Sequence, residues 1–187
     1  MINENIELQT LDQKLISHKP GFGSHNSIEV RSTGFTAGEW LPRKFTQEAD
    51  NVSPNVVWSN VPENTKELVL ICEDPHAPIP EPFVHWIIYG ISPKVHAFQE
   101  DIRVDSRPEV LQGAKQGKNS KGVNAYIGPF PPIASGPHYY YFQMFALDTE
   151  LNLAEGCERE EVVRKMEGHV IAQGTFIGIY ERFGTLG

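Results

Sequence analysis

Cysteine is scarce in this chain, and long apolar runs are missing. The 187 residues include two cysteines, Cys72 and Cys157, which do not make the disulfide framework of a small secreted domain. The longest apolar run, FVHWIIYGI at residues 83–91, is far shorter than the roughly 18 residues that a membrane-spanning helix requires. The N-terminus has no basic start followed by an apolar core, so it predicts no secretory signal. We therefore expect a cytoplasmic protein with no integral membrane segment, in which Cys72 is a small buried apolar residue.

Basic residues are also in short supply. Lysine and arginine total 16 against 24 aspartates and glutamates, which gives a formal net charge of −8. This charge works against attraction to the phosphates of nucleic acid and to anionic lipid surfaces. We therefore expect a small-molecule ligand and no nucleic-acid partner. A lipid-like ligand would have to enter a pocket.

Proline and glycine, in contrast, are frequent and spread along the chain. The 14 prolines and 16 glycines favour strands joined by tight loops. Apolar and β-branched runs predict strands at residues 28–35, 51–62, 67–73, 83–91, 139–148 and 175–183. The expected fold class is mainly β: an antiparallel β-sandwich with one or two peripheral α-helices. The length favours a single domain, which we place at residues 26–187 after an N-terminal arm at residues 1–25.

One long helix is predicted, at residues 158–173. Acidic residues lead its first turn and Gly174 follows its last residue, as is common at the two ends of a helix. Apolar residues recur on one face at helical spacing: Val162, Val163, Met166, Val170 and Ile171. We expect this helix at the periphery of the sandwich.

Polar side chains stand at the ends of three predicted strands. Asp74 directly follows the strand at 67–73, in the proline-studded stretch DPHAPIPEPFVHW, and His85 lies early in the next strand. His138 opens a third strand, and Tyr140, two residues on, points to the same side. If these strands are neighbours, a carboxylate, two imidazoles and a phenol line one pocket at the ends of the strands. A lone histidine in a strand is more often a packing residue. The prediction of a site therefore depends on the four side chains occurring together.

This combination resembles the phosphatidylethanolamine-binding protein family, which includes the Raf kinase inhibitor proteins. The resemblance is carried by DPHAP with HW seven residues beyond it, by AYIGPFPP and by HYYYF, and it covers about residues 25 to 183. Supporting matches are NVSPNVVWSNVP, GKNSKGVNAYIGP and GHVIAQGTFIGIYER. The short loop between DP and HW, together with the ending at YERF, is similar to the bacterial and archaeal branch.

The resemblance implies an anion-binding pocket lined by Asp74, His85, His138 and Tyr140, with Pro129 and Pro131 on its rim and no cofactor. Imidazole and phenol groups supply donors to a phosphate, and a charged acceptor strengthens such hydrogen bonds. Asp74 is suited to orient one histidine through its ring N–H.

Two residues depart from the family pattern. His76 stands where the family has a second aspartate, and Tyr139 stands where it has an arginine. His76 is either a solvated loop residue or a further ligand-binding residue, and it removes a charge that could contact an ammonium headgroup. The resemblance also implies cis peptide bonds in this loop, which we expect at Ala77–Pro78 and Glu81–Pro82.

Three functions follow as hypotheses. The favoured one is a binding protein for a small phosphate- or carboxylate-bearing, phospholipid-like ligand, which modulates a partner enzyme through the pocket rim. The alternative is an acid–base or metal-assisted hydrolase of small esters or phosphoesters, for which no nucleophile stands out, since Ser135 has no base assigned to it. A metal site built from Asp74, His76, His85 and His138 is the third, although we predict no metal because no HxxxH or HxH pair is present. The partner protein stays open, as does a homodimer.

Overall fold

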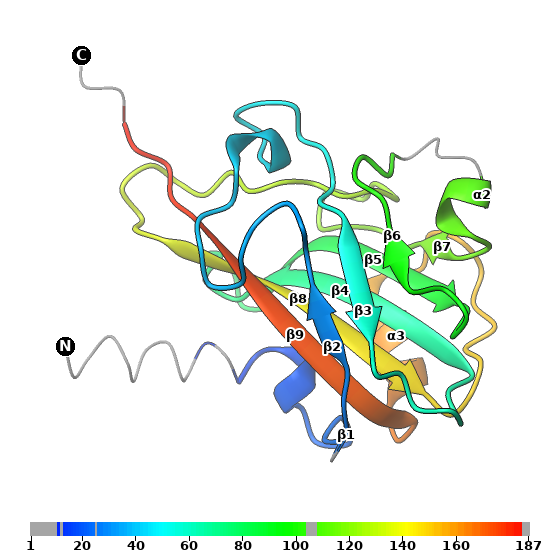
Figure 1. Ribbon diagram of the computed structural model, residues 1–187. Helices are drawn as coiled ribbons and strands as arrows, with labels where there is room; N and C mark the ends of the chain where they lie inside the picture. The colour runs from blue at the N-terminus through cyan, green and yellow to red at the C-terminus, as the bar shows by residue number, and fades with distance from the viewer. Residues whose placement is uncertain (1–10, 12, 25, 104–107, 185–187) are drawn as a thin grey trace.

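The computed structural model describes residues 11, 13–24, 26–103 and 108–184, and it consists of two β-sheets with helices outside them (Figure 1). The strands are β1 (Asn26–Ser27), β2 (Glu29–Arg31), β3 (Val56–Ser59), β4 (Glu67–Asp74), β5 (Phe83–Ile91), β6 (Ala97–Phe98), β7 (Lys115–Gln116), β8 (His138–Leu147) and β9 (Val170–Tyr180). The helices are α2 (Pro108–Leu111) and α3 (Arg159–Met166), with short 3₁₀ turns η1 (Ile16–His18) and η2 (Arg43–Phe45). None of the helices in these ranges is long and apolar enough to cross a bilayer.

The larger sheet has six strands in the order β1-β9-β8-β4-β5-β7, and the smaller sheet has the order β2-β3-β6. The long strands β4, β5, β8 and β9 pair antiparallel, whereas β1 pairs parallel with β9. This arrangement confirms the mainly β prediction, with helices at the periphery.

The six-stranded sheet is covered on both faces. Between the two sheets lies a core that includes Trp58, Trp86 and the stacked rings of Phe142 and Phe176. A second core on the other face packs α3 and the segment around Phe22 against the sheet. Every residue of β4 is consequently buried, as its continuous apolar sequence predicts.

The predicted helix at 158–173 is too long. α3 ends at Met166, and the chain reverses through Gly168, whose φ is +78°. Val170 and Ile171 belong to β9, where Val170 pairs with Leu147 of β8. The backbone hydrogen bonds of this pairing and the β-branched side chains favour the strand, although the apolar spacing also fits a helix.

The predicted cis bonds are also wrong. No peptide bond among the described residues is cis, so Ala77–Pro78 and Glu81–Pro82 are both trans, the intrinsically favoured isomer before proline. Hydrogen bonds define the turn instead. The His76 N–H donates to Asp74 Oδ1 over 2.8 Å, and the Ile79 N–H donates to the Ala77 carbonyl over 2.7 Å.

Candidate functional site

A cavity of about 230 Å³ lies where the end of β4 meets the beginnings of β5 and β8. Its walls come from Gln47, Asp74, Ala77, Pro78, Phe83, His85, Lys121, Phe130, Pro131, Pro132, His138 and Tyr140. The antiparallel pairing of β4 with both neighbours brings these distant segments together, because Asp74 pairs with Phe83 on one side and Glu73 pairs with Tyr141 on the other.

Asp74 and His138 form a buried pair at the base of this cavity. His138 Nδ1 lies 2.7 Å from Asp74 Oδ2, and each side chain is 5% exposed. Because an ionised carboxylate can only accept, Nδ1 carries the proton of this hydrogen bond. The other ring nitrogen, Nε2, lies 3.0 Å from the hydroxyl oxygen of Ser135. Both nitrogens of His138 therefore have partners within the protein.

His85 is held differently. Its Nδ1 lies 2.6 Å from the carbonyl oxygen of Ile127, which can only accept, so Nδ1 is protonated. Burial lowers the pKa of His85, against the opposing effect of the Asp74 carboxylate. The ring is thus neutral at neutral pH, and Nε2 carries a lone pair that no described residue approaches with a donor.

Tyr140 and Lys121 complete the polar lining. Burial raises the pKa of the Tyr140 phenol, as does the nearby Asp74 carboxylate, so the hydroxyl remains protonated and can donate. The Tyr140 ring packs edge-on against His85 at 5.0 Å between centroids. The Lys121 ammonium lies 5.9 Å from the centroid of the Phe83 ring. The cavity lining therefore includes a hydrogen-bond donor (the Tyr140 hydroxyl), a lone pair (His85 Nε2) and a cation (Lys121).

Most of the predicted site residues come together around the cavity: Asp74, His85, His138, Tyr140 and Pro131. Two do not line it. Pro129 is buried and its carbonyl accepts from the Gln47 N–H over 3.1 Å. His76 packs its ring against Tyr139, at 5.1 Å between centroids, and lies 6.0 Å from the His138 ring.

Several lining residues were not predicted from the sequence. Lys121 belongs to the GKNSKG stretch, and Gln47 comes from a loop that precedes every predicted site residue. Phe130 lies between two prolines that the motif did mark, so its place at the rim was within reach of sequence reasoning. The sequence assigned no partner to Ser135, and in the structure its hydroxyl oxygen lies 3.0 Å from His138 Nε2.

The described residues contain no group of three or more His, Cys, Asp and Glu side chains arranged to hold a metal ion. The set Asp74, His76, His85 and His138 is split by its hydrogen bonds. His85 directs Nδ1 to a backbone carbonyl, and His138 directs Nδ1 to Asp74.

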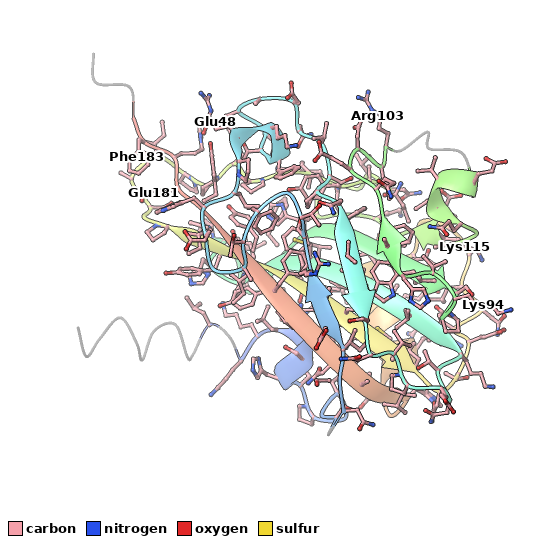
Figure 2. All side chains as sticks on the ribbon, in the orientation of Figure 1. Glu48, Lys94, Arg103, Lys115, Glu181 and Phe183 are labelled. Carbon is pink, nitrogen blue, oxygen red and sulfur yellow. The ribbon has the colours of Figure 1, made fainter. Side chains whose placement is uncertain are left out.

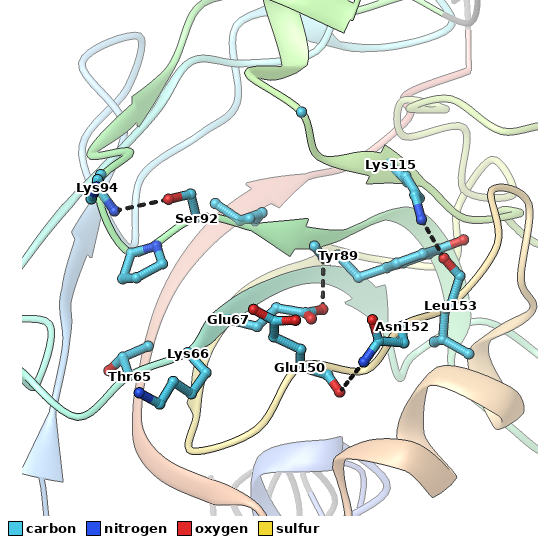
Figure 3. A pocket seen from close by; sticks show the side chains of 14 residues that line it. Thr65, Lys66, Glu67, Tyr89, Ser92, Lys94, Lys115, Glu150, Asn152 and Leu153 are labelled. Atoms are coloured by element: carbon cyan, nitrogen blue, oxygen red, sulfur yellow. Dashed lines mark hydrogen bonds between the residues drawn. The ribbon is translucent and has the colours of Figure 1, made fainter.

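A second, larger cavity of about 530 Å³ lies at the opposite ends of β4 and β5, where Glu67 and Tyr89 face Lys115 and Leu153 (Figure 3). The Glu67 carboxylate already accepts from the Gly90 and Leu151 N–H groups, over 2.7 and 2.8 Å. The Lys115 ammonium donates to the Leu153 carbonyl over 2.5 Å. These polar groups are engaged in holding loops together, so the smaller cavity is the better candidate site.

Known proteins are similar to this chain in sequence and in fold. A sequence model of the phosphatidylethanolamine-binding protein family matches residues 31–181. The UPF0098 protein of Aquifex aeolicus is 43% identical over 156 residues, which are 83% of this chain and 89% of that protein. The UPF0098 protein of Methanothermobacter thermautotrophicus is 40% identical over 155 residues, covering 83% and 99% of the two chains.

Solved structures of similar proteins have the same fold. A phosphatidylethanolamine-binding protein homologue from Chlamydia trachomatis superposes with a TM-score of 0.73 at 35% identity, over 84% of this chain and 99% of that one. YbcL of Escherichia coli, described as a member of the mammalian family, superposes with a TM-score of 0.75 at 29% identity, over 83% and 99%. The chain therefore belongs to the phosphatidylethanolamine-binding protein family.

Proposed function

We propose that this protein binds a small ligand through a phosphate or carboxylate headgroup in the cavity between His85 and His138. One observation carries the proposal: the Tyr140 hydroxyl and His85 Nε2 line a cavity and have no hydrogen-bond partner among the described residues. Both atoms are open to the cavity, so a ligand headgroup would replace water as their hydrogen-bond partner.

The charges around the cavity favour an acidic headgroup. Lys121 is the cation in its lining, and the Asp74 charge is partly compensated by its hydrogen bonds to His138 and to the His76 N–H. The Tyr140 hydroxyl is a donor to the anion. His85 offers a lone pair, so it binds best to a headgroup that keeps one acidic proton, or it takes up a proton when a fully ionised headgroup enters.

The size of the cavity limits what is enclosed. At about 230 Å³ it is smaller than the roughly 300–1,000 Å³ of sites for drug-sized molecules. Only a headgroup fits inside, and the rest of a phospholipid-like ligand would run over the rim. Phe130 and Ile133, which are 50% and 54% exposed, provide apolar surface there. The same rim is the surface that we propose for contact with a partner enzyme.

Titration calorimetry with phosphate, phosphoethanolamine and acetate tests the proposal. Saturable heat is expected from at least one of these ligands. Tyr140→Phe removes one hydrogen bond to a charged group, which is worth about 1.5–3 kcal/mol, so binding should weaken on the order of tenfold to a hundredfold. Tyr139→Phe is the matched control, because Tyr139 is the neighbouring residue on β8 and lies outside the cavity lining. Absence of saturable heat from all three ligands would refute the proposal.

A further inference from the structure

Ser135, His138 and Asp74 lie in a continuous chain of hydrogen bonds. Ser135 Oγ is 3.0 Å from His138 Nε2, and His138 Nδ1 is 2.7 Å from Asp74 Oδ2. Both distances lie within the roughly 2.6–3.2 Å expected between a nucleophile and its base. Asp74 and His138 are buried, whereas Ser135 is exposed and lies three residues after Pro132, which lines the cavity. This is the order of groups and the pattern of exposure that an activated serine requires.

The hydrogen positions are consistent with activation. Because Asp74 can only accept, the proton of a neutral His138 ring is on Nδ1 and the lone pair is on Nε2. The Ser135 hydroxyl donates to the Pro132 carbonyl over 2.8 Å. That carbonyl already accepts from the Ser135 backbone N–H over 3.3 Å. Rotation about the Cβ–Oγ bond would turn the same proton from this carbonyl to His138 Nε2, which lies 3.0 Å from Oγ.

The residues on both sides of Ser135 adopt left-handed backbone conformations. Ser135 is flanked by Ala134 with φ of +63° and Gly136 with φ of +80°. An alanine in the left-handed region costs roughly 1–2 kcal/mol, and such outliers concentrate at functional sites. Here the strained turn places the serine three residues before His138 with its hydroxyl on the ring nitrogen.

We propose that Ser135 is the nucleophile, His138 the general base and Asp74 a positioning residue in the hydrolysis of small carboxylic esters. Ser135 Oγ forms a bond to the acyl carbon while its proton passes to His138 Nε2. The C–O bond to the alcohol then breaks, and the leaving oxygen takes that proton. Water attacks the acyl-serine, again with His138 as base, and releases a carboxylic acid and the free hydroxyl. The Tyr140 hydroxyl and the Lys121 ammonium, both in the cavity lining, are the groups available to stabilise the oxyanion.

The cavity also limits the substrate class. The acyl group must fit about 230 Å³ beside His85 and Phe83, which favours short, apolar acyl chains. The larger alcohol can lie over the exposed rim. This proposal does not depend on tight anion binding, although the carboxylate product has the headgroup that the cavity is proposed to hold.

Covalent labelling tests the nucleophile directly. Diisopropyl fluorophosphate is expected to add one label per chain, on the peptide that contains Ser135, as measured by intact-protein and peptide mass spectrometry. p-Nitrophenyl acetate should be hydrolysed with an acyl-enzyme burst. Ser135→Ala should abolish the label and the burst. It should keep the fold, because Ser135 is exposed. Ser59→Ala is the control, since Ser59 is also exposed but its hydroxyl donates to the Glu29 carboxylate.

Asp74→Asn tests the role of the carboxylate. An amide that presents its NH₂ to Nδ1 favours the tautomer that is protonated on Nε2, which cannot act as base. The hydrolysis rate should fall on the order of 10⁴-fold, and circular dichroism should show whether the variant is folded. The proposal is overturned if no label forms, if it forms on another serine, or if Ser135→Ala hydrolyses the ester at the wild-type rate. Calorimetry of Ser135→Ala with acetate reports separately on anion binding, so the two proposals can fail independently.

Discussion

At the scale of single residues, we propose that His85 makes anion binding in the cavity depend on pH. Its Nδ1 is committed to the Ile127 carbonyl, and burial lowers the pKa of the ring, so the empty site contains a neutral imidazole. An ionised anion beside Nε2 favours the protonated ring, because a donor must then replace the lone pair. The proposed binding of such an anion would therefore take up one proton from solvent.

The proton uptake gives a prediction for acetate, which is ionised at neutral pH. Its affinity should decrease by about tenfold for each unit of pH rise above the pKa of free His85, because one proton is linked to binding. Calorimetry in buffers of different ionisation enthalpy should report uptake of about one proton. His85→Gln should remove the pH dependence. A wild-type affinity that is constant with pH would contradict this account.

At the scale of secondary-structure elements, a buried ion pair attaches α3 to the sheet. The guanidinium of Arg159, the first residue of α3, donates to Glu73 Oε1, and Gln143 Nε2 donates to Glu73 Oε2 over 2.7 Å. Gln143 in turn accepts from the Ser17 N–H over 3.1 Å. The network joins β4, β8, α3 and the N-terminal segment on the face opposite the smaller sheet.

Arg159→Met should leave the Glu73 carboxylate buried without its cation. The free energy of unfolding is expected to decrease by about 3–5 kcal/mol, as measured by urea denaturation. The double variant Glu73→Gln with Arg159→Met should recover much of the loss, since no uncompensated charge then remains. Equal destabilisation in the single and double variants would show that packing, not charge, attaches the helix.

The elements also show how far the sequence could predict the structure. β5 spans the residues predicted for it, because an apolar, β-branched run between proline-rich loops has few alternatives. The end of α3 was mispredicted because Val170 and Ile171 fit helical spacing, and only pairing with β8 decides against it. The family motifs predict that Asp74 orients one histidine, but they leave open that the partner is His138. Ser135 and Lys121 do not, because their contacts depend on the course of loops that no local pattern specifies.

At the scale of the whole molecule, the N-terminal segment completes the second core. Phe22 is buried and packs edge-on against Phe145 of β8, at 6.5 Å between ring centroids. We therefore propose that this part of the N-terminal arm unfolds together with the domain. Figure 2 shows the opposite case in Phe183, which projects from the C-terminal segment and is 74% exposed.

Phe22→Ala should destabilise the protein by about 3–5 kcal/mol, measured as the free energy of unfolding in urea, with one cooperative transition. Phe183→Ala is the matched control and should change that free energy by less than about 0.5 kcal/mol. A separate unfolding transition of the arm at lower urea concentration than that of the sheet would show that the arm unfolds independently of the domain.

The two strands that carry Asp74 and His138 run through the middle of the six-stranded sheet, whereas Phe130 and Ile133 sit on a loop at its margin. The proposed base and its positioning residue thus belong to the central strands, whereas the proposed nucleophile, Ser135, shares the exposed loop with Phe130 and Ile133. Related proteins can therefore change the ligand that they accept through substitutions at the exposed rim. The buried strands that stabilise the fold then remain unchanged.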